Sequence, residues 1–226
     1  MGLIRAISGG MGMRGFAKAV QSGTKSLLQV FLGLIAGLCI YVMSATLTGD
    51  QWGWNWLIAI FLAPVFTLPA VLIHEAGHAA GALRSGWIVE RFVVWPLAYS
   101  PRTRSWSFVS RPVGRGEIGG WVVTHPRPGR GSTREEVLVL VGGVVANVAS
   151  AIVCLVVSGF FASSSADTLL KAFAVFSIVL AVTNLIPWRI AGQASDGLQL
   201  LRLRRRKHRK AESKKTKSQW DVPRKW

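Results

Sequence analysis

The sequence has few acidic residues and almost no cysteine. Its 226 residues include 10 Asp and Glu against 27 Lys and Arg, which gives a net charge of +17, and only 2 cysteines. Cys39 and Cys154 lie inside apolar runs and form no Cys-x-x-Cys pair, so we do not expect a thiolate metal site. Because no motif of a nucleic-acid reader accompanies the positive charge, we also expect no nucleic-acid partner.

Long hydrophobic runs, by contrast, are abundant. Half of the residues are hydrophobic, and they gather in four runs at 27–47, 56–73, 137–161 and 172–188. A helix needs about 20 apolar residues to cross the hydrocarbon core of a bilayer. The sequence therefore predicts an all-α polytopic membrane protein with four transmembrane helices, in which the run 27–47 is an accessory anchor and residues 56–200 form the core.

The positive charges orient these predicted spans. Of the 27 Lys and Arg, 26 lie before the first run, between the second and third, or after the fourth, and Lys171 is the exception. By the positive-inside rule, both termini and the loop 84–136 are cytoplasmic, while the loops 48–55 and 162–170 face outward. We therefore expect a multi-pass protein of the cell membrane with a basic cytoplasmic N-terminal segment at 1–26.

The C-terminal tail, 201–226, is dominated by Lys and Arg, and we expect it to be disordered. The basic cluster at 202–210 has two interpretations. It attracts anionic lipid, at about 1 kcal/mol for each basic residue close to the surface, or it only fixes the topology.

The long cytoplasmic loop has a different pattern from the spans. Val, Ile, Phe and Trp alternate with turn formers at 88–95, 105–109 and 118–123, which is typical of short strands. We expect a small β element at the membrane interface, between the second and third transmembrane helices.

The second apolar run leads into the only His-Glu-x-x-His sequence of the chain, at His74, Glu75 and His78. On a helix, two histidines four residues apart lie on one face and can bind one Zn²⁺, while the glutamate lies beside the open coordination position. Two helix histidines bonded to neighbouring carbonyls are the alternative. Histidine and glutamate are costly at bilayer depth, which favours the metal site.

A catalytic zinc usually takes three protein ligands, so the two histidines need a partner at the same depth. Asp196 lies beside the cytoplasmic end of a predicted span, and Gly197 lets the backbone approach closely. His125 is flanked by proline and arginine, and we expect it to be solvated. The other aspartates are predicted outside the membrane or deep in the tail: Asp50, Asp167 and Asp221.

At these positions the chain resembles the site-2 protease family of intramembrane zinc metalloproteases, over roughly 57–200. The resemblance rests on the histidine motif, a middle span with Gly142, Gly143 and Asn147, and a last span with Asn184-x-x-Pro187 followed by Asp196-Gly197. The chain departs from the family pattern in two ways. The segment from Pro187 to Asp196 is longer than usual, and Ser195 stands where Leu is common. The loop of about 50 residues is too short for the PDZ domain of many relatives, so the chain is similar to a minimal member.

The resemblance implies a zinc ion held by His74, His78 and Asp196, and Glu75 as the general base. It also implies that Asn147 holds the substrate or stabilises the transition state; from the residues alone, Asn147 has the alternative of bonding a neighbouring helix. The implied function is cleavage of membrane-spanning proteins, often to release membrane-tethered regulators. The sequence leaves open whether the protein has a regulatory membrane partner or forms a homo-oligomer.

Three alternatives remain at this point. A membrane zinc protease with a glutamate as third ligand has Glu90, Glu117 and Glu135 as candidates. A catalytically inactive scaffold would not need Glu75. A metal transporter would need ionisable groups along a complete path, and the outer halves of the predicted spans hold almost none.

Overall fold

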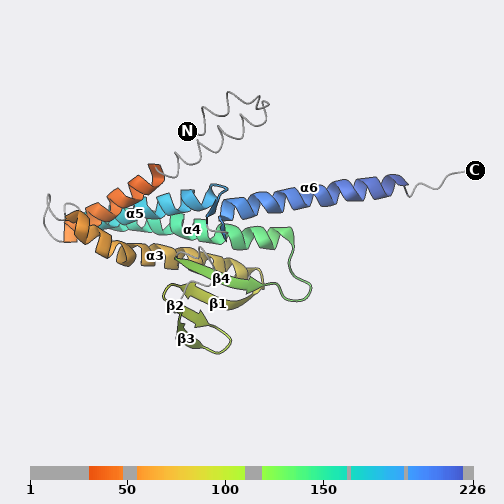
Figure 1. Cartoon of the computed structure of the whole chain (residues 1–226), viewed down its shortest axis with the longest axis horizontal. Helices are drawn as coiled ribbons and strands as arrows, with labels where there is room; N and C mark the ends of the chain where they lie inside the picture. The colour runs from red at the N-terminus through yellow and green to blue at the C-terminus, as the bar shows by residue number, and fades with distance from the viewer. Residues whose placement is uncertain (1–30, 48–54, 110–118, 162–163, 191–192, 221–226) are drawn as a thin grey trace, which may run out of the picture.

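The computed structural model describes residues 31–47, 55–109, 119–161, 164–190 and 193–220 (Figure 1). It is mostly helical, with a small antiparallel sheet and a two-stranded hairpin. A helix at Phe31–Leu47 precedes the labelled elements. In chain order these are α3 (Asn55–Arg84), β1 (Ile88–Val94), β2 (Leu97–Ser100), β3 (Ser105–Phe108), β4 (Gly120–His125), α4 (Thr133–Ser158), η1 (Gly159–Phe161), α5 (Ser165–Leu185), β5 (Arg189–Ile190), β6 (Gln193–Ala194) and α6 (Asp196–Trp220).

Helix α3 carries the histidine motif through its last three turns and ends at Arg84, as the sequence predicts. Gly86 adopts φ +72°, which favours glycine, and Trp87 N–H donates to Ala82 O at 2.9 Å. These two features close the helix and turn the chain into β1. The metal motif therefore lies near one end of a 30-residue helix, close to the sheet.

Helix α4 packs against both α3 and α5 and lies between them in Figure 1. Its predicted capping box is confirmed: Ser132 Oγ accepts from Glu135 N–H, and the Glu135 carboxylate accepts from Ser132 N–H at 3.1 Å. Glycines allow the close contact with α3, since a Cβ at Gly77 or Gly142 would overlap the backbone carbonyl of the other residue. This close approach brings the polar face of α4 against the histidines.

The sheet has the strand order β3-β2-β1-β4, with every pair antiparallel. The prediction of strands in this loop is confirmed, but β2 is an additional strand that the sequence analysis missed. Its Leu97-Ala98-Tyr99-Ser100 segment follows Pro96 directly, and this proline masks the strand signal. Strand β4 is an edge strand, and its Val122 packs with Val89, Ala82 and Val139 against α3 and α4.

Two helical stretches, Thr133–Phe161 and Ser165–Leu185, are long and apolar enough to cross a membrane. In their most apolar windows only 22% and 33% of the residues are buried, unlike those of a core helix in a soluble protein. A shorter apolar helix, Phe31–Leu47, falls within the first predicted run. The basic segment 1–26 and the loop 48–54 lie outside the described residues.

The start of the last predicted span needs a correction. Helix α5 begins at Ser165 and not near 172, because Ser164 caps it by accepting from Asp167 N–H and Lys171 pairs with Asp167 at 2.9 Å. Asp167 and Lys171 interrupt the apolar run in the sequence, but the helix continues through both residues. At the other end Ile186 is extended, as expected before Pro187, so α5 stops at Leu185.

The tail is the second correction. The sequence analysis predicts disorder over 201–226, whereas α6 continues to Trp220 and extends beyond the three packed helices (Figure 1). No proline interrupts 196–220, and Lys, Arg, Glu, Gln, Leu and Ala are all good helix formers. Arg206 also pairs with Glu136 on α4 at 2.9 Å, which fixes the first part of the helix against the core.

Candidate metal centre

The two histidines of α3 meet at their Nε2 atoms. His74 and His78 are one helical turn apart, their rings stand edge to face at 88°, and the two Nε2 atoms are 3.1 Å apart. His74 is buried, while the side chain of His78 is 12% exposed. The i, i+4 spacing thus places two ligand nitrogens side by side, as predicted.

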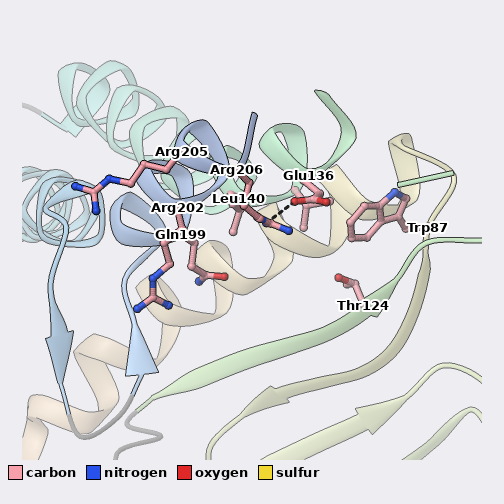
Figure 2. Close-up of a pocket in the computed structure, with 9 residues that line it drawn as sticks. Trp87, Thr124, Glu136, Leu140, Gln199, Arg202, Arg205 and Arg206 are labelled. Atoms are coloured by element: carbon pink, nitrogen blue, oxygen red, sulfur yellow. Dashed lines mark hydrogen bonds and ion pairs between the residues drawn. The ribbon is translucent and has the colours of Figure 1, made fainter. Parts of the chain in front are cut away.

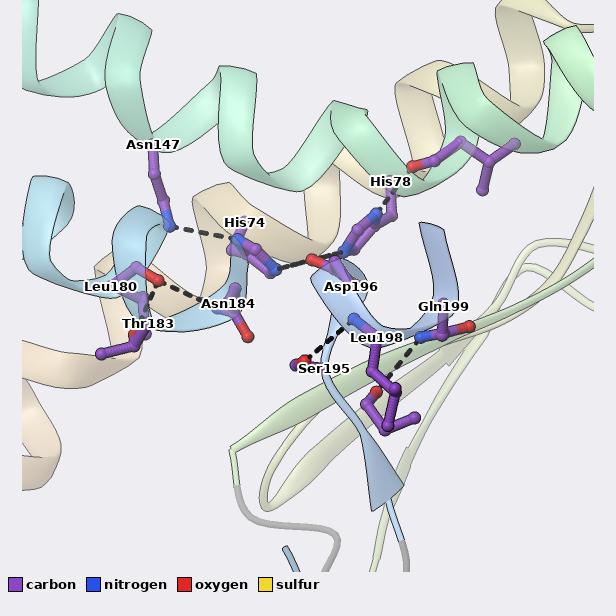
Figure 3. Close-up of polar contacts among 12 residues, drawn as sticks. His74, His78, Asn147, Leu180, Thr183, Asn184, Ser195, Asp196, Leu198 and Gln199 are labelled. Atoms are coloured by element: carbon purple, nitrogen blue, oxygen red, sulfur yellow. Dashed lines mark hydrogen bonds and ion pairs between the residues drawn. The ribbon is translucent and has the colours of Figure 1, made fainter. Parts of the chain in front are cut away.

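Asp196 completes the group, although 118 residues separate it from His78 in the chain. Its Oδ2 lies 3.2 Å from His74 Nε2 and 3.3 Å from His78 Nε2 (Figure 3). The three side chains form a group that could hold a metal ion. Among the residues that the structure describes, Asp196 is the aspartate that lies with the two histidines, while Asp50 and Asp221 lie outside the described ranges.

The longer segment before Asp196 has a structural reason. Strands β5 and β6 pair Arg189 with Ala194 and Ile190 with Gln193, so the chain leaves α5 and returns to its end. Gly197 packs so tightly there that a Cβ would overlap the carbonyl oxygen of Leu185. The hairpin uses the additional residues and still brings Asp196 back to the level of the histidines.

Ser195 fixes this return. Its hydroxyl donates to Ile186 O at 2.7 Å and accepts from the backbone N–H of Leu198 and of Trp188, both at 3.2 Å. The bond from Leu198 makes Ser195 the N-cap of α6, which places Asp196 at the first helical position. A leucine at this position could make none of these bonds, so the departure from the family pattern suits this hairpin.

The outer nitrogens of the imidazoles have partners on α4. His78 Nδ1 donates to Val139 O at 2.7 Å, which leaves the Nε2 lone pair directed at Asp196 and His74. His74 Nδ1 lies 3.1 Å from Asn147 Nδ2, and Asn147 Oδ1 is buried without a partner. Turning the Asn147 carboxamide by half a turn would let Oδ1 accept from Nδ1–H and free the Nε2 of His74 for a metal.

Asn147 is fully buried behind His74, on the side away from Asp196 (Figure 3). It does not line the cavity that contains Glu75. This position favours the alternative in which Asn147 bonds a neighbouring helix, here α3 through His74. It argues against a direct contact between Asn147 and a substrate.

Gly143 provides the room for both rings. A Cβ at this position would lie 2.6 Å from His78 Nε2 and 2.8 Å from His74 Nε2. Any larger residue on this turn of α4 would displace the ligands. The small-residue face of α4, predicted for helix packing, therefore also makes space for the candidate metal centre.

The donor atoms fit a tetrahedral ion. Three atoms about 2.0–2.1 Å from a common centre, at tetrahedral angles, are about 3.3 Å from one another. The three separations here are 3.1, 3.2 and 3.3 Å. Asp196 Oδ2 is buried and, despite these short distances, has no hydrogen bond of acceptable geometry. A cation among the three atoms would satisfy this oxygen.

Glu75 lies beside the three candidate ligands in a cavity of about 340 Å³. It is 7% exposed and contacts β4, where a Cβ at Gly120 would lie 2.7 Å from Glu75 Cγ. Glu75 is placed next to the candidate ligands without joining the group itself. An ionisable carboxyl group therefore lines a cavity beside the candidate metal position.

The glutamates considered as alternative third ligands lie elsewhere. Glu90 is exposed on β1 and lies 3.7 Å from His125, which is itself half exposed. Glu135 caps α4 and accepts from Gly131 N–H at 2.6 Å. Glu117 lies outside the described residues. The two described candidates are thus not near His74 and His78, and His125 is solvated as expected.

The sequence analysis missed the rest of the cavity wall. Strand β4 forms one side with Gly120, Trp121, Val122 and Thr124, and Asn184 and Gln199 contribute from α5 and α6. Asn184 is part of the Asn184-x-x-Pro187 pattern in the sequence, but the sequence predicts no role for it. Nothing local distinguishes the β4 residues or Gln199, because only the tertiary fold brings the sheet edge and α6 to the histidines.

No protein-family model, curated protein or solved structure matches this chain.

Proposed function

We propose that this protein is a zinc-dependent endopeptidase of the membrane that cuts membrane-spanning protein substrates. The observation that carries the proposal is the arrangement of His74, His78 and Asp196 around one point, with Glu75 beside it in a cavity. These are the residues that match the motifs of the site-2 protease family in the sequence. Two candidate membrane-spanning helices, α4 and α5, pack at this site.

The donor set supports zinc as the ion. Zinc is commonly held by imidazole nitrogens and carboxylate oxygens in a tetrahedral site, and a catalytic zinc leaves one position open. Two histidines and one aspartate supply three of the four positions. Harder cations such as Mg²⁺ prefer six oxygen ligands, and this group offers only one carboxylate.

In the proposed reaction, different residues of the chain have different roles. A bound zinc would supply Lewis acidity, polarising the peptide carbonyl and acidifying water. Glu75 accepts a proton from the attacking water and passes it to the leaving amine. His78 is oriented by Val139 O and His74 by Asn147, so Asn147 acts as a positioning residue rather than by contact with substrate.

Substrate presentation is assigned to β4. A helical substrate hides its peptide bonds in its own hydrogen bonds, so the segment to be cut must unwind. Among the described strands, β4 pairs with β1 alone, and its Gly120 lies against Glu75. An extended segment added to the free edge of β4 would gain backbone hydrogen bonds and lie next to the general base.

We place the protein in the cell membrane with four transmembrane helices and cytoplasmic termini. Large apolar side chains are exposed along the helices, including Phe61 at 79%, Phe160 at 81% and Leu34 at 67%. Exposed apolar surface of this extent marks contact with lipid or with a partner. We therefore propose lipid as a partner of the helices. The basic part of α6 keeps both interpretations, attraction of anionic lipid or a role in topology alone.

The test is cleavage of a single-span protein by the purified chain in liposomes. Wild-type protein should cut the substrate, a chelator should stop cleavage, and added Zn²⁺ should restore it. Glu75→Gln should stay inactive with zinc present. Cleavage that persists after complete metal removal would refute the proposal.

A further inference from the structure

A second cavity, lined by several arginines, adjoins the candidate metal centre. It measures about 740 Å³ and lies between α6, the first turns of α4 and the end of β4. Arg202, Arg205 and Arg206 line it from α6, together with Gln199. Figure 2 shows Arg202 and Gln199 extending from α6 toward β4, and Arg206 reaching Glu136.

The two cavities are neighbours. Four residues line both of them: Thr124, Val139, Leu140 and Gln199. A ligand in the arginine cavity and a peptide at Glu75 would therefore share walls. A single extended segment could occupy both spaces.

The charge in the arginine cavity is unbalanced. Its lining contains three arginines and one acidic residue, Glu136, whose carboxylate already pairs with Arg206 at 2.9 Å. Among the described side chains, Arg202 and Arg205 have no carboxylate partner within ion-pair distance. The guanidinium groups are therefore available to a ligand that carries carboxylates, which Arg binds through paired hydrogen bonds.

Strand β4 gives the separation between Glu75 and the part of the arginine cavity at Thr124. Gly120 contacts Glu75, and Thr124, four residues later, lines the arginine cavity. At about 3.3 Å per residue, these positions are about 13 Å apart along the strand. A substrate segment lying along β4 would bring a side chain three to five residues from the cut bond to the arginines.

We propose that the cavity lined by Arg202, Arg205 and Arg206 is a substrate subsite that selects an acidic segment about four residues from the bond that is cut. This inference rests on the proposed function and names the substrate class of that site. The cavity lies where α3 ends and α4 begins, so the segment is the cytoplasmic flank of the substrate. Because such flanks commonly carry Lys and Arg, the arginines also reject most membrane proteins by repulsion.

The experiment uses three single-span substrates that differ only in two residues of this flank, which are Asp-Asp, Asn-Asn or Lys-Lys. The cut bond is first located by mass spectrometry, and the pair is placed three to five residues from it on each side in turn. In liposomes of phosphatidylcholine, wild-type protein should cut the Asp-Asp substrate at least tenfold faster than the Lys-Lys substrate, as kcat/KM, for one of the two placements.

A charge-reversed variant gives the sharpest control. Arg202→Glu with Arg205→Glu should reverse the preference toward Lys-Lys, and a reversed preference also demonstrates that the variant is folded. Arg204→Glu, on the same helix but outside the cavity lining, should keep the wild-type preference. An unchanged preference in the double variant would overturn the proposal.

A binding measurement separates this inference from the proposed function. Inactive Glu75→Gln protein should bind the Asp-Asp substrate more tightly than the Lys-Lys substrate, even if no preparation shows cleavage. Absence of cleavage in the wild type would contradict the protease, whereas equal binding of all three substrates would contradict only the subsite. If the rates follow added phosphatidylglycerol and not the substrate charge, the cavity is a lipid site and the proposal is wrong.

Discussion

At the residue scale, the two imidazoles differ in what orients them. A backbone carbonyl, Val139 O, fixes His78, and no side-chain substitution removes that bond. His74 depends on Asn147, a fully buried side chain. The orientation of His74 can therefore be altered by mutation while that of His78 stays intact.

Substituting Asn147 tests this difference. Asn147→Leu removes the partner of His74 Nδ1 and should lower the affinity for Zn²⁺ by about 10–100-fold, the usual loss for a residue that orients a metal-bound histidine. Asn147→Asp keeps an acceptor for Nδ1–H and should retain most of the affinity. Competition with a chromophoric chelator measures both. A leucine variant with wild-type affinity would show that Asn147 does not position His74.

The three members of the candidate metal group, His74, His78 and Asp196, could be predicted from the sequence. The i, i+4 spacing of His74 and His78 fixes their geometry on any helix, and only one aspartate lies at the correct end of a span. Gly120, Thr124 and Arg202 could not be found in this way. Their place at the site depends on how the sheet and α6 pack against α4, which no local pattern encodes.

At the element scale, the short connection between α5 and α6 determines whether Asp196 reaches the histidines. The β5–β6 hairpin and the N-cap at Ser195 hold this connection. The sequence shows only that the spacing from Pro187 to Asp196 is longer than is usual in the site-2 protease family. The pairing of two-residue strands was not predictable, because such short strands carry no periodic pattern.

Removing the cap should therefore affect the metal as well as the fold. Ser195→Ala deletes the acceptor of Leu198 N–H and the donor to Ile186 O, and should cost about 1 kcal/mol of stability together with a lower affinity for Zn²⁺. Ser195→Thr keeps the hydroxyl group and should preserve both. Thermal unfolding in detergent and a zinc titration provide the measurements. Unchanged zinc affinity in the alanine variant would contradict a role of Ser195 in placing Asp196.

Helix termini were predicted best where caps are strong. The ends at Gly86 and Ser132 were correct because a left-handed glycine and a capping box are local signals. The hydropathy run predicts a start of α5 near residue 172, which is wrong because the cap at Ser164 sets this end of the helix. The charge density of 201–226 predicts disorder, whereas the same Lys, Arg and Glu residues favour the helix that α6 forms.

At the scale of the whole molecule, the proposed function requires that the two ends of the helix bundle face opposite sides of a membrane. The candidate metal centre, the sheet and the arginine cavity all lie at the end where α3 stops and α4 starts. The opposite end contains the turn between α4 and α5, where Ser165 is exposed. From the distribution of Lys and Arg, we propose that the first end faces the cytoplasm.

Single cysteines test this assignment in a Cys39→Ala, Cys154→Ala background. An impermeant maleimide added outside cells should label Ser165→Cys and should not label Ser107→Cys, which is exposed on β3. Ser107→Cys should react only after the membrane is opened. Labelling of Ser107→Cys from outside would reverse the topology.

Measuring both zinc content and substrate cleavage in variants of the site tests the proposed metal centre most directly. Glu75→Gln should keep about one zinc per chain and lose cleavage, because Glu75 lies outside the group of ligand atoms. His74→Ala, His78→Ala and Asp196→Ala should each lose both, since two protein ligands hold zinc weakly, and His125→Ala should lose neither. If Asp196→Ala retained its full zinc, or if Glu75→Gln still cleaved the substrate, the proposed metal centre and its mechanism would be contradicted.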